Sequence, residues 1–183
     1  QALHSDYSFI FLKKSDLDIS SYSELETYFE DSNIDVVINC AAYTKVAQAE
    51  LERDKADAAN FLGVKNLATM ARERAIKLIH ISTDAVFDGQ KSRPYIESDA
   101  TNPLNAYSKS KLDGEKAMLA ANPENSIIIR TSWVYSKYGN NFVKTMVGLG
   151  CNKKSVVVIN DQIGTPTSAK DLACVILNIL PNI

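Results

Sequence analysis

Short apolar runs that alternate with helix-like segments constrain the fold of this chain more than any other feature. Residues 35–40 (DVVINC) form a near-continuous apolar run, which is typical of a strand in a parallel sheet covered on both faces. Residues 77–81 and 126–130 are similar runs, and helical patterns lie between the runs. Alternating strands and helices predict an α/β fold with a doubly wound, mostly parallel sheet.

Local signals predict the remaining elements. Strand-type runs also occupy residues 7–12 and 155–159. Ser21 and Glu24 have the spacing of a capping box, and Asn105 can cap the helix that follows it. Helices are expected from Ser21, over about 47–75 with a break near Arg53, from Asn105 to about 122, over 141–149 and over about 168–180. Residues 84–105 are rich in Gly, Pro, Asp and Ser and predict a loop, which we interpret as a lid over a substrate.

The first residues lack a feature that such a fold should have. Gln1–Leu3 followed by residues 5–7 has the pattern of a helix end running into a strand. A Rossmann-like dinucleotide domain opens with a strand and a glycine-rich turn. Neither is seen at the start of this sequence, and its 7 glycines are scattered. The only close pair, Gly148 and Gly150, follows a helical stretch and indicates a helix end. Either the amino-terminal segment is missing or a pyrophosphate is held in another way, and we favour the first.

Composition argues against several classes of protein. The formal net charge is −2, so no basic face predicts binding to nucleic acid or to an anionic membrane. Cys40, Cys151 and Cys174 are widely separated and form no Cys-x-x-Cys, which argues against a disulfide framework and a zinc site and favours the cytoplasm. No apolar run approaches the roughly 18 residues of a membrane helix. A small charged metabolite is the expected partner.

Tyr107 and Lys111 form a candidate catalytic pair. Residues four apart on a helix share a face, so the ammonium can favour the ionised form of the phenol, whose pKa is normally about 10. Alone the pair is weak evidence, because a surface helix often carries such a spacing by chance. The strand at 77–81 also delivers residues 82–84 (STD) to its carboxyl end, where open α/β sheets place ligands. The hydroxyl of Thr83 can there share a carbonyl oxygen with Tyr107.

These residues and several longer segments resemble the dTDP-4-dehydrorhamnose reductase family of the extended short-chain dehydrogenase/reductase superfamily. The matching segments, in the order of the family, are 39–44 (NCAAYT), 82–89 (STDAVFDG), 130–135 (RTSWVY), 139–142 (GNNF) and 160–167 (NDQIGTPT). The resemblance implies a single NAD(P)-binding, Rossmann-like domain over residues 1–183, truncated at both ends. Partial elements of the substrate lobe are expected within residues 131–183.

The resemblance implies NADPH-dependent reduction of the 4-keto group of dTDP-4-dehydro-L-rhamnose to dTDP-L-rhamnose, for polysaccharide biosynthesis. Tyr107 would supply the proton, Thr83 a second hydrogen bond, and Lys111 would hold the nicotinamide ribose and lower the pKa of Tyr107. Dehydratases of the superfamily have Thr-Asp-Glu where this chain has Ala85 after Asp84, which favours reduction over dehydration. Ala85 also replaces a tyrosine common in the reductases, which leaves the shape of that pocket wall open.

The cofactor is expected to be NADPH, with NADH as an alternative. Lys13 and Lys14 follow the run 7–12, where an acid would bind the ribose hydroxyls of NAD and two lysines suit a 2′-phosphate. Ordinary solvated surface charges are the competing interpretation. The cofactor-binding residues implied by the resemblance are Asp18 and Ile19 near adenine, then Ala41, Ala42, Tyr43, Thr44, Ile81, Tyr107 and Lys111.

The resemblance also implies a set of substrate-binding residues, which are Thr83, Asp84, Trp133, Asn140, Asn141 and Gln162. Trp133 is the only tryptophan, and a flat apolar ring suits the face of a deoxyhexose. Some family members hold magnesium at a dimer interface with the acid of a Pro-Thr-x-x-Glu segment. Lys170 stands at that position here, so we expect no metal, and a homodimer stays open.

A non-catalytic binding protein is the alternative function. The regulatory subunit of methionine adenosyltransferase is similar to these reductases, and a chain without a phosphate-binding loop can still contact a partner. The retained Thr83, Tyr107 and Lys111 favour an enzyme, whereas the missing glycine-rich segment favours the alternative. A fragment of a larger enzyme would explain both ends of the chain.

Overall fold

The computed structural model describes residues 7–183, so the helix end expected at Gln1–Leu3 lies outside the described residues. The chain divides into two compact units, one ending at Arg130 and the other comprising Thr131–Ile183. Each unit is described by itself. The expected single domain, with substrate-lobe elements within residues 131–183, stays a prediction.

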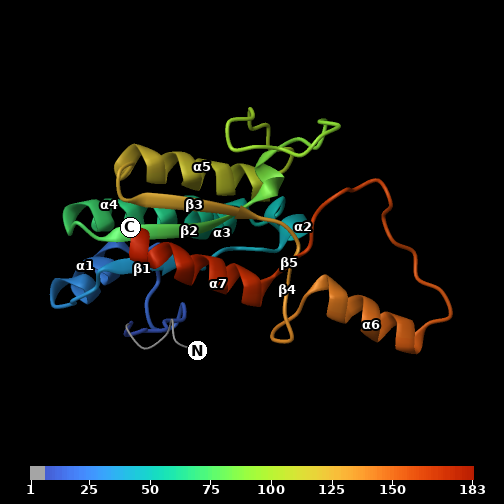
Figure 1. Ribbon diagram of the computed structural model, residues 1–183, viewed down its shortest axis with the longest axis horizontal. Coiled ribbons are helices and arrows are strands. Elements are labelled where there is room, and N and C mark those ends of the chain that lie inside the picture. Colours follow the sequence, from blue (N-terminus) through green and yellow to red (C-terminus); the bar gives the residue numbers. More distant parts are fainter. Residues whose placement is uncertain (1–6) are drawn as a thin grey trace. The chain divides into compact units, whose positions relative to one another are not determined.

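A parallel sheet forms the centre of the first unit (Figure 1). Its strands are β1 (Val36–Asn39), β2 (Lys77–Thr83) and β3 (Ser126–Thr131), in the order β1-β2-β3. Strand β1 runs parallel to β2, with Val36 opposite Lys77 and Asn39 opposite His80. The three strands lie where the apolar runs predict them, and their parallel pairing agrees with the predicted α/β fold.

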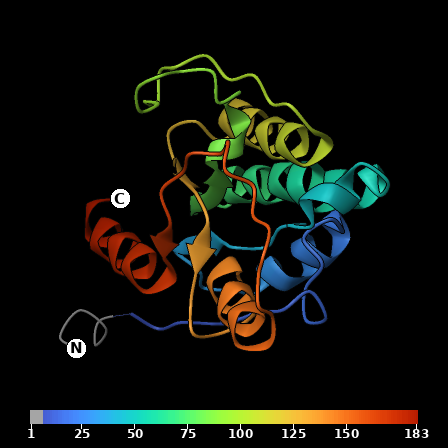
Figure 2. The same cartoon turned by 90° about the vertical axis from the view of Figure 1, so that its right-hand side faces the viewer.

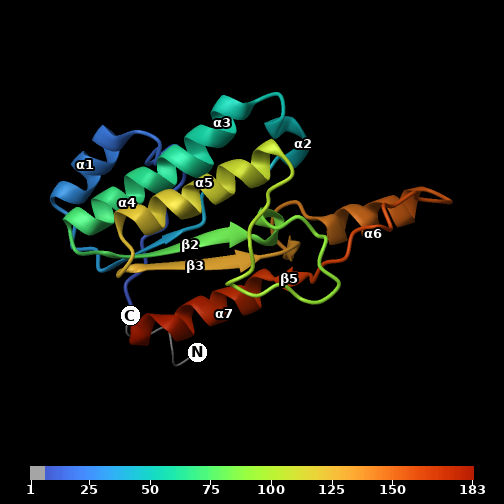
Figure 3. The same cartoon turned by 90° about the horizontal axis from the view of Figure 1, so that it is seen from above.

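Three helices cover one face of this sheet. Figure 3 shows α1 (Tyr22–Glu30), α4 (Gly63–Glu73) and α5 (Ala106–Ala121) side by side above the strands. Their inward side chains form a single apolar core with the sheet, which removes apolar surface from water and stabilises the unit. The largest members of this core include Leu25, Phe29, Leu67, Met70, Leu78 and Met118.

The long helical region divides as predicted near Arg53 and contains one irregular turn. It consists of α2 (Val46–Ala49), α3 (Arg53–Asp57) and a π-helix, η2 (Ala58–Leu62), that leads into α4. Helix α5 packs closely on η2 because Gly114 has no side chain. A Cβ atom at Gly114 would lie 2.0 Å from the carbonyl oxygen of Asn60. This approach places Asn60 beside the first turns of α5.

Two predicted strands are wrong. Residues 7–12 and 155–159 form no strand, and their apolar side chains are exposed, with Phe11 at 88% and Val157 at 100%. An extended segment becomes a strand only when a neighbouring strand takes its backbone hydrogen bonds. In residues 7–183 neither segment belongs to a sheet. Apolar composition alone therefore overestimated the strand content.

The loop predicted for residues 84–105 begins with a 3-10 turn, η3 (Asp84–Val86), and then has no regular helix or strand before α5. Figure 2 shows the loop in yellow-green, at the top of the view. Its own side chains hold it together. The rings of Phe87 and Tyr95 stack with centroids 4.3 Å apart, and the Tyr95 hydroxyl donates to Asp88 at 2.8 Å. Lys91 and Asp99 form an ion pair within the same loop.

The second unit contains a small parallel pair of strands, β4 (Val134–Tyr135) and β5 (Thr167–Ser168). Its helices are α6 (Phe142–Asn152), α7 (Ala169–Ile179) and the 3-10 turn η4 (Leu180–Asn182). Ser168 caps α7 by accepting a hydrogen bond from the Asp171 amide, as its spacing predicts.

Within the described part of the chain, every helix is too short or too polar to cross a lipid bilayer.

Candidate functional site

Thr83 and Tyr107 meet at the carboxyl end of β2. Thr83 is the last residue of that strand, and its hydroxyl accepts a hydrogen bond of 3.2 Å from the Ala85 amide. Tyr107 lies in the first turn of α5, which Asn105 caps by accepting from the Ser108 amide at 2.8 Å. A side-chain hydrogen bond joins Thr83 to the phenol of Tyr107. The structure therefore brings this predicted pair together.

The acidity of Tyr107 differs from the expectation. Burial raises the pKa of Tyr107, the hydrogen bond with Thr83 lowers it in part, and the carboxylate of Asp84 raises it further. Among the described residues, Lys111 does not contribute to this shift, so the expected lowering by the ammonium is not found. At neutral pH the phenol keeps its proton and can act as a donor.

Lys111 is almost completely buried, with 2% of its surface exposed. Its Nζ donates a 2.8 Å hydrogen bond to the carbonyl of Ile81 and lies 3.1 Å from Nε2 of His80. Burial lowers the pKa of Lys111 to about 8, whereas Glu115 and Cys40 act in the opposite direction. The amine therefore points toward β2, which explains why it leaves the pKa of the phenol unchanged.

His80 is a buried neighbour of the site that the sequence interpretation missed. Burial first, and then the charge of Lys111, lower the pKa of His80 to about 3, so the ring is neutral. Its Nδ1 lies 3.1 Å from Nδ2 of Asn39, and Oδ1 of Asn39 accepts a 3.0 Å hydrogen bond from the Ala41 amide. A histidine inside an otherwise apolar strand was the available signal.

Asn60 connects the segment expected near nicotinamide to α5. Its side chain bonds both backbone groups of Tyr43, accepting from the amide at 2.8 Å and donating to the carbonyl at 3.0 Å. The same Nδ2 donates to Oγ of Ser110 at 3.0 Å, and Ser110 donates to the carbonyl of Tyr107 at 2.8 Å. Asn60 is fully buried, so these bonds fix residues 41–44 against the helix of Tyr107.

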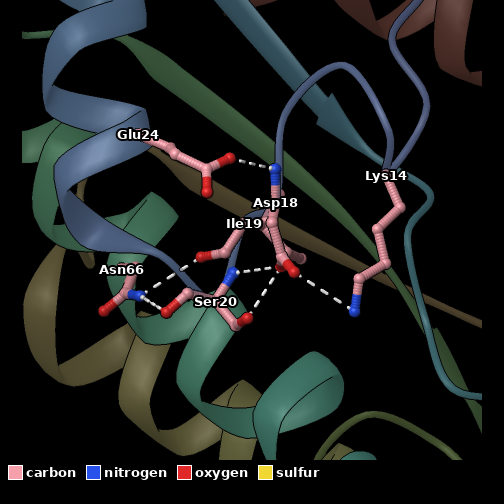
Figure 4. Close-up of polar contacts among 6 residues, drawn as sticks. All are labelled: Lys14, Asp18, Ile19, Ser20, Glu24 and Asn66. Atoms are coloured by element: carbon pink, nitrogen blue, oxygen red, sulfur yellow. Dashed lines mark hydrogen bonds and ion pairs between the residues drawn. The ribbon is translucent and has the colours of Figure 1, made fainter.

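The turn expected near adenine is also held firmly (Figure 4). The carboxylate of Asp18 accepts from the amide and hydroxyl of Ser20 at 3.0 and 2.7 Å and pairs with Lys14 at 3.2 Å. The two bonds from Ser20, with Lys14, lower the pKa of Asp18. Nδ2 of Asn66 donates to the carbonyls of Ile19 and Ser20 at 3.2 and 3.1 Å. Lys14, expected at a 2′-phosphate, therefore has an acidic partner in this structure.

An ion pair supports the strand end from the other side. Ser82 donates a 2.5 Å hydrogen bond to Glu115, and Nη2 of Arg130 donates to the same carboxylate at 2.6 Å. The guanidinium of Arg130 also lies 5.0 Å from the ring centroid of Phe87, in the loop after β2. Glu115 is only 2% exposed. Ser82 thus supports the end of β2 through Glu115, and the sequence interpretation missed Glu115 and Arg130.

Trp133 adopts an uncommon conformation in the second unit. Its φ angle is 47°, in the left-handed region, and its side chain is 48% exposed. Gly164 lies against the indole, since a Cβ atom there would be 3.0 Å from two ring carbons. A strained and exposed aromatic residue is typical of a binding position, although its contact with substrate stays a prediction.

The other predicted substrate residues of the second unit differ in their surroundings. Asn141 caps α6 by accepting from the Lys144 amide at 3.1 Å, and it donates to the carbonyl of Ser136 at 2.6 Å. Its side chain is therefore already engaged within the unit. Asn140 and Gln162 are exposed. The substrate role of these residues stays a prediction.

Comparison with known proteins places this arrangement in context. A family model described as "RmlD substrate binding domain" matches residues 1–183. The chain is 45% identical over 177 residues to dTDP-4-dehydrorhamnose reductase of Aggregatibacter actinomycetemcomitans, which covers 97% of this chain and 60% of that protein. The chain thus spans about three fifths of that relative.

Solved structures of such reductases have the same fold. The enzyme from Clostridium acetobutylicum superimposes with a TM-score of 0.94 at 42% identity, covering 98% of this chain and 63% of that one. The enzyme from Bacillus anthracis in complex with NADP gives a TM-score of 0.90 at 39% identity, covering 98% and 65%. These likenesses agree with the predicted Rossmann-like fold.

Proposed function

The chain belongs to the dTDP-4-dehydrorhamnose reductase family, and we propose that it serves the NADPH-dependent reduction of dTDP-4-dehydro-L-rhamnose to dTDP-L-rhamnose. One observation carries the proposal. The hydroxyls of Thr83 and Tyr107 meet at the end of β2, and Lys111 lies one helical turn further along α5. Two hydroxyls that converge in this way can hold a single carbonyl oxygen.

The residues around this point fit a nicotinamide cofactor. Ala41 and Ala42 follow β1 with side chains of one carbon, which lets a flat ring approach the backbone. An ammonium has three N–H groups, and those of Lys111 that face Ile81 and His80 leave one for a ribose hydroxyl. When bound, NADPH supplies a hydride to the keto carbon.

Each proposed catalytic residue has a separate task. Negative charge develops on the keto oxygen during reduction, and the Thr83 hydroxyl stabilises it by donating a hydrogen bond. Tyr107 transfers its proton to that oxygen, which completes the alcohol and leaves a phenolate. Because burial raises the pKa of Tyr107, the phenolate readily regains a proton from water. Lys111 holds the cofactor and carries the positive charge of the site.

Replacing the phenol tests this proposal. We expect Tyr107→Phe to lower the rate of NADPH consumption with dTDP-4-dehydro-L-rhamnose by about 10²–10⁴-fold, the usual contribution of a general acid. Tyr138→Phe is the matched control, because that tyrosine is 73% exposed and its loss should leave the rate unchanged. Equal rates for the protein and the Tyr107→Phe variant would remove the catalytic assignment.

A further inference from the structure

One side chain, that of Arg130 in β3, contacts both α5 and the loop at residues 84–105. Nη2 of Arg130 donates to Oε2 of Glu115 at 2.6 Å, and Nε donates to Oε1 of the same carboxylate at 3.1 Å. The central carbon of the guanidinium also lies over the ring of Phe87, 5.0 Å from its centroid. A guanidinium can bond a carboxylate and lie on an aromatic ring at the same time. The ion pair of Glu115 and Arg130 therefore joins the loop to α5 and the sheet.

Thr83 and Asp84 lie between two segments that this ion pair holds. Ser82, directly before them, donates a 2.5 Å hydrogen bond to the carboxylate of the pair. Phe87, three residues after Asp84, lies against its guanidinium. Between these points the chain forms the turn η3, which is closed by a 3.0 Å hydrogen bond from the Phe87 amide to the Asp84 carbonyl. Residues 82–87 are thus fixed at both ends by the same pair of charges.

The stack on Arg130 continues into the loop. The rings of Phe87 and Tyr95 lie at an angle of 12° with centroids 4.3 Å apart, and Nζ of Lys91 lies 5.5 Å from the centroid of Tyr95. The Tyr95 hydroxyl donates to Asp88 at 2.8 Å and accepts from the Lys91 amide at 3.2 Å. Two cations therefore flank two aromatic rings, an arrangement in which each contact is attractive. The stack extends from the sheet to the middle of the loop.

Burial of the ion pair indicates that it fixes an arrangement. Glu115 is 2% exposed and the side chain of Arg130 is 24% exposed. A buried ion pair contributes little net stability, because the cost of removing two charges from water offsets their attraction. The hydrogen bond to Glu115 raises the pKa of Arg130, burial acts against it, and the charge of Glu97 adds to the rise. Glu97 belongs to the loop, so the loop attracts the guanidinium through an acid as well as through a ring.

We propose that Arg130 is a positioning residue that fixes residues 82–87 and the loop after them, so that Asp84 forms part of a preformed wall for the sugar nucleotide. Arg130 acts through Glu115 and Phe87 instead of on the reacting atoms. This role rests on the proposed function, because the sugar nucleotide is the ligand that Asp84 would contact. Substrate affinity falls with the fraction of molecules in which the wall is in place. A loosened loop should therefore raise the KM for the sugar nucleotide and leave kcat and the affinity for NADPH nearly unchanged.

Three variants test the stack. Phe87→Leu keeps an apolar side chain and the ion pair but removes the ring. Arg130→Lys keeps the charge, but a compact ammonium cannot bond Glu115 through two nitrogens and also lie flat on a ring. We expect each to raise the KM for dTDP-4-dehydro-L-rhamnose about tenfold, the scale of one cation–π contact, with kcat within about twofold. Phe87→Tyr keeps the ring and should stay within about twofold of the unmodified protein in both values.

The double variant separates one shared contact from two independent supports. If Arg130 and Phe87 act through their contact, Phe87→Leu combined with Arg130→Lys should raise the KM about tenfold, as either change does alone. Independent effects would multiply to about a hundredfold. A hundredfold rise would overturn the proposal, and so would a fall in kcat with an unchanged KM.

Hydrogen exchange of the loop gives a measurement that requires no activity. The Asn102 amide donates to the carbonyl of Val86 at 2.9 Å, and amides within residues 87–102 should exchange about tenfold faster in Phe87→Leu but not in Phe87→Tyr. If exchange in Phe87→Leu is unchanged, or if it rises while the KM does not, the inference fails. If exchange responds as expected but the unmodified protein reduces no sugar nucleotide, the proposed function fails while the contact between Arg130 and the loop stands.

Discussion

Gly114→Ala should destabilise the protein, although alanine normally stabilises a helix. Gly114 lies within α5, where a Cβ atom would be 2.0 Å from the carbonyl oxygen and 3.2 Å from the carbonyl carbon of Asn60. Both are backbone atoms of η2, so no side-chain rotation can relieve the overlap. The two helices would have to separate by about 1.4 Å, from 2.0 to 3.4 Å, to restore an ordinary contact at this point.

Two opposing effects set the size of the change. Alanine in place of glycine stabilises a helix interior by about 1 kcal/mol. Forcing an extra carbon into a packed contact costs about 1–3 kcal/mol, and the overlap with rigid backbone places Gly114 at or above the upper end. The free energy of unfolding should fall by about 2 kcal/mol. Because Asn60 bonds to Tyr43 and Ser110, Gly114→Ala should also slow the proposed reduction of the sugar nucleotide.

Urea unfolding followed by circular dichroism measures this change. Gly63→Ala is the matched control, since the nearest atoms are Cγ1 and Cδ1 of Ile19 at 2.6 and 2.7 Å, in a side chain that can rotate. The free energy of unfolding of Gly63→Ala should stay within about 1 kcal/mol of that of the unmodified protein. Gly148→Ala meets nothing within 4 Å and should not destabilise. If Gly114→Ala is as stable as Gly63→Ala, the argument from close helix packing is refuted.

Three further changes have defined outcomes. Lys14→Ala should raise the KM for NADPH about tenfold and leave the KM for NADH unchanged. Lys116→Ala, at an exposed lysine, is the control and should change neither value. If Lys14→Ala raises the KM for NADPH and the KM for NADH equally, Lys14 does not bind a 2′-phosphate. Since burial lowers the pKa of Lys111 to about 8 and its ammonium is the binding form, NADPH affinity should be constant below pH 8 and fall above it in fluorescence titrations. An affinity for NADPH that increases above pH 8 would refute the assignment of the Lys111 ammonium as the binding form. Glu115→Gln should lower the free energy of unfolding by about 2 kcal/mol, because Arg130 loses its carboxylate, and a change in urea unfolding below about 0.5 kcal/mol would argue against it.

Features set by neighbours in sequence could be predicted. Ser21, Asn105 and Ser168 each accept a hydrogen bond from the amide three residues later, as a helix cap requires. The strands β1 and β2 were also evident, because the mainly apolar runs at residues 35–40 and 77–81 are typical of buried parallel strands. The meeting of Thr83 with Tyr107 follows from the end of one strand and the start of one helix.

Features that depend on distant partners could not be predicted. The run at residues 7–12 has the composition of a strand but lies in no sheet of the described chain, because composition does not specify a neighbour. The π-helix at Ala58–Leu62 has no local signal either, and it lies against Gly114, more than 50 residues away. The partners of Glu115 were missed for the same reason.

The acidity of Tyr107 shows what a helical spacing does and does not determine. Tyr107, Lys111 and Glu115 share one face of α5, but each finds its partner on a strand, and the amine of Lys111 turns to Ile81 instead of the phenol. The pKa of Tyr107 is therefore set by burial, with smaller contributions from Thr83 and Asp84, and it is raised. A raised pKa keeps the phenol protonated, which is the form that donates to a keto oxygen. At neutral pH the phenol is thus in the protonated form that the proposed reduction uses.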